Sequence, residues 1–141
     1  MIRPVRLAIV DDHEMIRQTW KMILQRNDRI EVIAECASGL EAIECAQKDA
    51  PDVMLMDINM PLMNGFEATE KISQQFPEIK IIGISINNQP SYARSMMQLG
   101  AKGYVTKNSD STEMLEAIFS VTEGKTYICK DIRPRMEGKL I

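Results

Sequence analysis

Short runs of apolar residues alternate with longer stretches of helical periodicity along most of the chain. Within each run the apolar residues are mostly consecutive, which is typical of strands covered on both faces of a sheet. The runs are Leu7–Val10, Ile30–Ala34, Val53–Met56, Ile81–Ile84 and Tyr104–Val105. Between them, apolar residues recur with the spacing of one helix face, and in the first stretch these are Met15, Ile16, Trp20, Ile23 and Leu24. The pattern predicts five strands alternating with five helices.

Glycine and proline residues stand where the predicted helices should end. Gly100 and Gly124 occupy expected C-cap positions, and Pro77 closes the third helix. Alternating strands and helices favour an α/β domain, (βα)5, with a parallel sheet. Right-handed crossovers leave few topologies, of which the doubly wound open sheet is the commonest. We expect one domain over residues 1–124 and a linker or tail over residues 125–141.

The composition of the 141 residues is that of a globular protein, with 45% hydrophobic and 26% charged residues. The net charge of -3 argues against non-specific nucleic-acid binding by the body of the chain, although the tail is basic. Cys36, Cys45 and Cys129 show no zinc-site spacing, and we expect buried, reduced thiols. No apolar run approaches the roughly 18 residues of a membrane span. These features predict a cytoplasmic protein without a membrane contact.

Polar side chains follow four of the predicted strands. Asp11 and Asp12 follow the first strand, Asp57 the third, Ser85 the fourth and Lys107 the fifth. In an open α/β sheet, ligands bind outside the carboxyl ends of the strands, so these side chains should converge. Crowded carboxylates repel one another unless a cation relieves them, and oxygen ligands suit Mg²⁺. With a hydroxyl and an ammonium group nearby, the set predicts a phosphoryl-binding site.

Each of these residues, taken alone, has a purely structural explanation. An Asp after a strand is often a helix N-cap, a lone Lys is usually a solvated charge, and a lone Ser is a turn residue. Their joint placement at one sheet edge favours the functional interpretation. We expect His13, at the start of a helix beside the acids, to be a spectator, because the predicted phosphoryl-binding site needs no base.

The motifs also resemble those of a known family. They are Val10-Asp11-Asp12, the stretch from Asp57 to Gly65, Ser85, the stretch from Gly100 to Tyr104, and Lys107. Their order and spacing resemble the receiver domain of bacterial two-component response regulators, over about residues 4–124. The resemblance implies a flavodoxin-like sheet of five parallel strands in the order 2-1-3-4-5. It also implies a phosphoacceptor switch rather than a turnover enzyme, with only self-catalysed phosphoryl transfer and autodephosphorylation.

The resemblance implies a role for each acidic residue. Asp57 would accept a phosphoryl group from a sensor histidine kinase or a phosphotransfer protein. Asp12 and Asp57 would ligate Mg²⁺ directly, together with the backbone carbonyl of Asn59, and Asp11 would act through water. Asn59 and Asn87 lie where the family varies its dephosphorylation rate.

The remaining implied roles concern the response to phosphorylation. Lys107 would neutralise one phosphoryl oxygen, and Ser85 would hydrogen-bond another. Tyr104 would be the switch aromatic that turns inward when Ser85 moves, and phosphorylation would promote homodimers. Two departures stand out: Asn108 replaces the proline that often follows the lysine, and Ser85 replaces the commoner threonine.

Asn108 and the stretch from Gly124 to Ile128 resemble the NarL/FixJ-type regulators, whose receiver precedes a helix-turn-helix domain. The 17 residues from 125 to 141 are too few for such a module. The basic, Pro-containing tail favours a linker to an output domain absent from this chain, so DNA would be contacted only there. The alternative is a stand-alone receiver that acts by protein–protein interaction or in a phosphorelay.

Three other functions fit the sequence less well. A haloacid-dehalogenase-type phosphohydrolase places its nucleophile in an Asp-x-Asp motif after the first strand, where this chain has Asp11-Asp12-His13. A pseudo-receiver that only binds would lack one of the key side chains, and all are present. A nucleotide-binding domain would carry a glycine-rich phosphate loop after a strand, and none follows.

Overall fold

The structure is an α/β sandwich around one parallel sheet. The computed structural model describes residues 3–137. Six strands lie in the order β2-β1-β3-β4-β5-β6. The strands are β1 (Val5–Val10), β2 (Ile30–Cys36), β3 (Val53–Asp57), β4 (Lys80–Ser85), β5 (Gly103–Thr106) and β6 (Tyr127–Ile128). The helices are α1 (Glu14–Leu24), α2 (Gly39–Lys48), α3 (Gly65–Gln75), α4 (Pro90–Gln98), α5 (Ser111–Thr122) and α6 (Arg133–Glu137).

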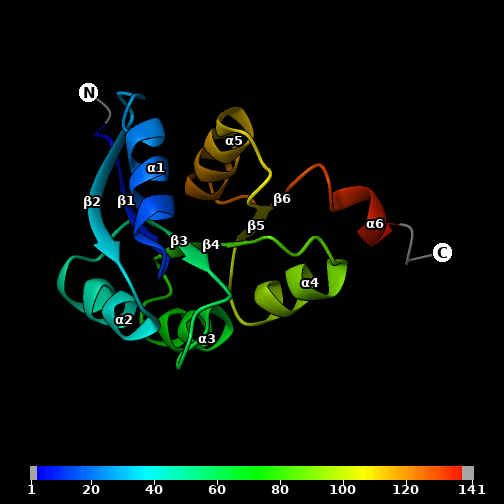
Figure 1. Ribbon diagram of the computed structural model, residues 1–141, viewed down its shortest axis with the longest axis horizontal. Helices are drawn as coiled ribbons and strands as arrows, with labels where there is room; N and C mark the ends of the chain where they lie inside the picture. Colours follow the sequence, from blue (N-terminus) through cyan, green and yellow to red (C-terminus); the bar gives the residue numbers. More distant parts are fainter. Residues whose placement is uncertain (1–2, 138–141) are drawn as a thin grey trace.

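Helices cover both faces of the sheet: α1 and α5 lie on one side, and α2, α3 and α4 on the other (Figure 1). All five residues of the central strand β3 are buried, which explains its uninterrupted apolar run. The predicted α/β class, the doubly wound arrangement and the strand order 2-1-3-4-5 are confirmed, with β6 as an addition. Within residues 3–137, no helix has the length and apolar character that a membrane crossing requires.

The start of α3 fixes the loop that follows β3. Asn64 caps the helix by accepting a hydrogen bond from the Glu67 amide at 3.0 Å, and the Glu67 carboxylate accepts one from the Asn64 amide. The next residue, Gly65, packs against the end of β3, where an added Cβ would lie 2.5 Å from the Asp57 carbonyl oxygen. A glycine is therefore required for the first turn of α3 to approach this strand end.

The segment predicted as a linker contains ordered elements in the part that the structure describes. β6 extends the sheet by pairing in parallel with β5, and Cys129 and Ile132 are buried. The Tyr127 hydroxyl donates a hydrogen bond to Glu113 of α5 at 2.9 Å. The periodicity did not predict β6, because two residues are too short to show a pattern. The domain boundary at residue 124 stays a prediction.

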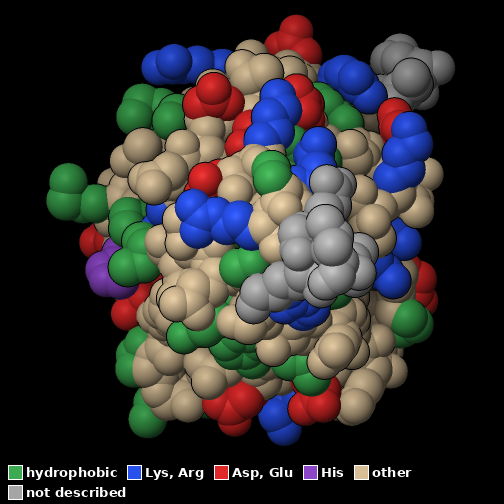
Figure 2. Space-filling view, turned by 90° about the vertical axis from the view of Figure 1, so that its right-hand side faces the viewer, with side chains coloured by type: hydrophobic (Ala, Val, Ile, Leu, Met, Phe, Trp, Pro, Cys, Tyr) green, Lys and Arg blue, Asp and Glu red, His purple; other side chains and the backbone are tan. Residues whose placement is uncertain are grey.

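Basic side chains are scattered over the face that carries α4, β6 and α6. Figure 2 shows the Lys and Arg side chains of this face separated from one another by other side chains, some of them acidic. Among the described residues visible on this face, the basic side chains do not form a continuous stripe of the kind that is typical of a nucleic-acid contact.

Part of the predicted α1 stripe does not pack against the core. Leu24 is fully buried and Trp20 packs against the core, but the side of α1 at Met15 is open and Met15 is 81% exposed. Met15 lies in the first turn of α1, beside the carboxyl edge of the sheet, where no element among residues 3–137 covers it. Periodicity finds the face of a helix but not how far along its length that face is covered.

Candidate functional site

The carboxyl ends of four strands bring the candidate side chains to one edge of the sheet. Asp11 follows β1, Asp57 ends β3, Ser85 ends β4 and Lys107 follows β5. The Lys107 amide donates a hydrogen bond to the Ser85 carbonyl at 2.9 Å, so the loop after β5 stays joined to β4. The side chains that the sequence places after separate strands thus belong to one site.

Three carboxylates and one imidazole form its centre. The ligand atoms of Asp11, Asp12, His13 and Asp57 lie within 4.8 Å of one another. Asp57 is fully buried and Asp11 nearly so, whereas the Asp12 side chain is 27% exposed. Solvent and ions can therefore reach the cluster from the side of Asp12.

The His13 ring lies against the two acids that follow β1. Its Nδ1 lies 3.0 Å from Asp11 Oδ1 and 3.3 Å from Asp12 Oδ1, and its backbone amide donates to Asp11 Oδ1 at 2.8 Å. The ring is 60% exposed. The amide hydrogen bond explains this position, because it holds the loop before α1 against Asp11.

The electrostatics of the cluster centre on Asp57. Burial raises the pKa of its carboxyl, and the Asp11 carboxylate raises it further. Two groups lower this pKa: the Asn59 amide, which donates a hydrogen bond to Asp57 Oδ1 at 3.1 Å, and the positive charge of the Lys107 ammonium, 3.7 Å from Oδ2. The second oxygen, Oδ2, has no hydrogen-bond partner within the described residues. A buried carboxylate oxygen without a partner, beside two further carboxylates, fits a hard divalent cation such as Mg²⁺.

The raised pKa of Asp57 predicts a stability cost in the metal-free protein. The folded state binds the Asp57 proton more tightly than the unfolded state does, so protonation of Asp57 stabilises the fold. This stabilisation is fully present below the usual Asp pKa of about 3.9 and is lost as pH rises through the folded pKa. We expect Asp57→Asn to raise the free energy of unfolding by about 1–3 kcal/mol at neutral pH. Urea denaturation in the presence of a chelator measures this, with the exposed Asp28→Asn as control. An unchanged midpoint for Asp57→Asn would contradict the electrostatic account.

The Ser85 hydroxyl is held on the other side of the site. It accepts hydrogen bonds from the Asn59 side-chain amide and the Asn87 backbone amide, both at 3.0 Å. The Tyr104 ring is fully buried, and its hydroxyl donates to the Asn87 carbonyl at 3.0 Å. Burial raises the pKa of Tyr104 to about 12, so the phenol stays protonated and can donate. Asn59, Ser85, Asn87 and Tyr104 form one connected chain of hydrogen bonds.

The sequence did not reveal the Asn59 side-chain contact. Asn59 and Ser85 are 26 residues apart, and only the pairing of β3 with β4 brings them together. The one available signal in the sequence was that Asn59 is polar and lies two positions after Asp57, which ends a buried strand.

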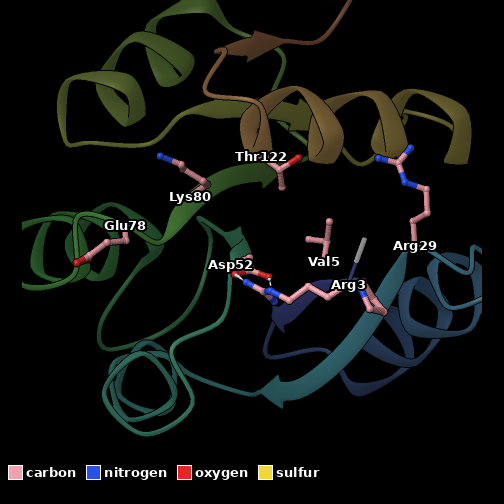
Figure 3. Close-up of a pocket in the computed structure, with 8 residues that line it drawn as sticks. Arg3, Val5, Arg29, Asp52, Glu78, Lys80 and Thr122 are labelled. Atoms are coloured by element: carbon pink, nitrogen blue, oxygen red, sulfur yellow. Dashed lines mark hydrogen bonds and ion pairs between the residues drawn. The ribbon is translucent and has the colours of Figure 1, made fainter. Parts of the chain in front are cut away.

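A separate cavity lies at the opposite edge of the sheet. It has a volume of about 320 Å³ and is lined by residues that include Arg3, Asp52, Lys80 and Thr122 (Figure 3). Asp52 forms a two-point ion pair with Arg3, at 2.9 and 3.0 Å, so its charge is already neutralised. This ion pair holds Arg3 beside the start of β3.

The sequence matches a family model and is similar to curated proteins. Residues 7–119 match the response regulator receiver domain. The chain is 40% identical over 137 residues to the transcriptional regulatory protein DegU of Brevibacillus brevis, covering 97% of this chain and 56% of that protein. It is 36% identical to the response regulator UvrY of Escherichia coli strain K12, covering 94% of this chain and 61% of that protein. The chain therefore spans somewhat more than half the length of these relatives.

Solved structures show the same arrangement. A LuxR-family two-component response regulator from Aurantimonas sp. SI85-9A1 is 30% identical, with a TM-score of 0.93, and the match covers 96% of this chain and 97% of that one. The signal receiver domain of the putative response regulator NarL from Mycobacterium tuberculosis is 28% identical, with a TM-score of 0.83, and the match covers 87% of this chain and 99% of that one. These names agree with the subfamily resemblance drawn from the sequence.

Proposed function

The chain belongs to the response regulator receiver domain family, and from that premise we propose that Asp57 accepts a phosphoryl group from a sensor histidine kinase or phosphotransfer protein. The observation that carries this proposal is the buried Oδ2 of Asp57, which has no hydrogen-bond partner among residues 3–137 and lies 3.7 Å from the Lys107 ammonium. A carboxylate held this way is a nucleophile beside a charge that can neutralise the incoming group.

Mg²⁺ is the cofactor that the acidic cluster supports. Asp12, Asp57 and the backbone carbonyl of Asn59 would hold it directly, with Asp11 acting through water. When bound, the cation would neutralise phosphoryl oxygen charge and relieve the repulsion among the carboxylates. The chain's own contribution is to hold Asp57 in line with the donor, since phosphoryl transfer depends on position and charge more than on covalent help.

Lys107 and Ser85 would carry the signal away from Asp57. The Lys107 ammonium lies 3.3 Å from Asp11 Oδ2 and 3.7 Å from Asp57 Oδ2, where it can meet one phosphoryl oxygen. The Ser85 hydroxyl accepts from the Asn59 and Asn87 amides, so its own proton is available to donate to another phosphoryl oxygen if the side chain moves toward Asp57. Its movement would alter the hydrogen bonds that reach Tyr104 through Asn87. Because the Tyr104 ring is already buried, we propose that phosphorylation changes its hydrogen bonds rather than turning the ring inward from solvent.

The output we propose is transcription regulation in the cytoplasm. Relatives of this chain are named as transcriptional or response regulators, and the chain matches only part of their length. Residues 125–141 would then lead toward a helix-turn-helix domain, through which alone DNA would be bound, and phosphorylation would favour a homodimer. A stand-alone receiver acting by protein–protein contact or in a phosphorelay is the alternative.

Lys107→Ala is expected to uncouple phosphorylation from its response. The variant keeps the Asp57 nucleophile and should still accept phosphate from acetyl phosphate, but it loses the charge that draws the site together. In the unchanged chain we expect phosphorylation to strengthen self-association by about 5–150-fold, as for a typical coupling between sites. In Lys107→Ala we expect no strengthening. Light scattering with Mg²⁺ and acetyl phosphate measures this.

Lys102→Ala is the matched control, because Lys102 is exposed and, within residues 3–137, makes only backbone hydrogen bonds. It should self-associate as the unchanged chain does. Normal phosphorylation-dependent association of Lys107→Ala would refute the role of Lys107, and no association of the unchanged chain would refute the homodimer.

A further inference from the structure

Two of the three cysteines line the same small cavity. Cys36 ends β2, and Cys45 lies in α2, which packs beside that strand. Both side chains border the same cavity of about 220 Å³, and each thiol shifts the pKa of the other. Cys36 is 3% exposed and Cys45 6% exposed, so the thiols are sheltered but lie on the wall of a cavity that opens to solvent. The pair therefore differs from thiols that are enclosed in a core.

The surroundings of the two thiols are not equivalent. The Cys36 thiol, as hydrogen-bond donor, has the largest effect and lowers the pKa of Cys45. Burial and the Asp49 carboxylate raise this pKa and the positive charge of Arg6 lowers it, and the net result is a lowered pKa. Arg6 is fixed nearby, because its guanidinium donates to the carbonyls of Asp49 and Ala50 at 2.8 and 2.9 Å. The thiolate is the reactive form of cysteine, so Cys45 is the thiol more able to attack and Cys36 the partner that keeps its proton.

The charges around the cavity restrict which oxidants can enter. Its lining includes one basic side chain, Lys48, and four acidic ones, which are Glu35, Glu41, Glu44 and Asp49. Anionic oxidants such as glutathione disulfide meet this negative surface, whereas a small neutral peroxide does not. The volume of about 220 Å³ is large enough to admit a molecule of the size of water or hydrogen peroxide.

We propose that Cys36 and Cys45 form a peroxide-responsive dithiol that closes into an intramolecular disulfide. The Cys45 thiolate attacks one oxygen of hydrogen peroxide, the O–O bond breaks, and the departing hydroxide takes a proton to become water. The Cys36 sulfur then displaces the hydroxyl of the sulfenic acid, which leaves as a second water. In sum, two thiols and one hydrogen peroxide give one disulfide and two waters. This modification is separate from the proposed phosphoryl transfer and does not depend on it.

Peptide mapping of the folded chain after brief exposure to hydrogen peroxide tests the proposal without any substitution. After alkylation of free thiols, trypsin releases residues 30–48 as one peptide that contains both cysteines, and further cleavage after Glu41 and Glu44 separates them. We expect the peptide to escape alkylation, to lack two hydrogen atoms, and to stay joined after the second cleavage until a reductant is added. Cys129, fully buried and with its pKa raised by burial, serves as the internal control and should remain a free thiol.

Three results would overturn the proposal: both cysteines alkylated after exposure, sulfinic acid without a linked peptide, or a disulfide between two chains. Single variants test the order of the steps. Cys36→Ser should accumulate a sulfenic acid on Cys45 that dimedone traps, whereas Cys45→Ser should yield none on Cys36. Cys129→Ser should close the disulfide as the unchanged chain does. A trapped sulfenic acid on Cys36 in Cys45→Ser, at the yield of Cys36→Ser, would refute Cys45 as the attacking thiol.

Discussion

Asp57→Asn is expected to abolish phosphoryl labelling of the chain by acetyl phosphate. The substitution keeps the size of the side chain and its place at the end of β3, but the amide has no anionic oxygen to attack phosphorus. It also removes one of the three carboxylates that favour the cation. The Asp57 side chain is fully buried beside Asp11. Another carboxylate could therefore occupy its position only if the end of β3 moved.

The control for this prediction is Asp28→Asn, since Asp28 is exposed in the turn before β2, at the opposite edge of the sheet. It should label as the unchanged chain does. Labelling can be followed by intact mass, with urea denaturation showing that the variant is folded. Retained labelling of a folded Asp57→Asn chain would refute the assignment of the acceptor.

Gly65→Ala is expected to be the most damaging small substitution for stability. The added Cβ would lie 2.5 Å from the Asp57 carbonyl oxygen and 2.5 Å from the Ile58 Cα, and both are backbone atoms that cannot rotate away. Either α3 must move away from the sheet or the end of β3 must shift. We expect a loss of about 3 kcal/mol of unfolding free energy, at the upper end for overpacking, and weaker labelling of Asp57.

Gly124→Ala gives the matched comparison. An added Cβ there meets nothing within 4 Å, and only the positive φ of 87° is unfavourable for alanine. The cost should be about 1–2 kcal/mol, the strain of one left-handed residue. Urea denaturation of both variants checks the order, and a Gly65→Ala chain no less stable than Gly124→Ala would contradict the close packing at Asp57.

The site could be predicted from the sequence because its residues are tied to buried strands. Once β1, β3, β4 and β5 are recognised as apolar runs in an α/β alternation, the residues at their carboxyl ends must share one edge. That placed Asp11, Asp57, Ser85 and Lys107 together without knowledge of any distance. The order of strands followed from the family resemblance and is confirmed by the observed pairing.

Features that depend on tertiary contacts between distant residues could not be predicted in this way. β6 is too short for a periodic signal, and it is defined by its pairing with β5 and by the hydrogen bond of Tyr127 to Glu113 on α5. The hydrogen bond from Asn59 to Ser85 arises from the register of β3 against β4. The sequence indicated reduced thiols at Cys36 and Cys45, but only the packing of α2 beside β2 brings the two together.

The central claim is that Asp57 is the acceptor in a cation-dependent site, and mapping the phosphoryl group tests it most directly. The chain is incubated with acetyl phosphate in Mg²⁺ or in a chelator, the acyl phosphate is trapped by borohydride reduction, and the peptides are sequenced by mass spectrometry. The account predicts one modified residue, Asp57, in Mg²⁺ and almost none in the chelator. Modification at another residue, or equal labelling of Asp57 in both conditions, would contradict it.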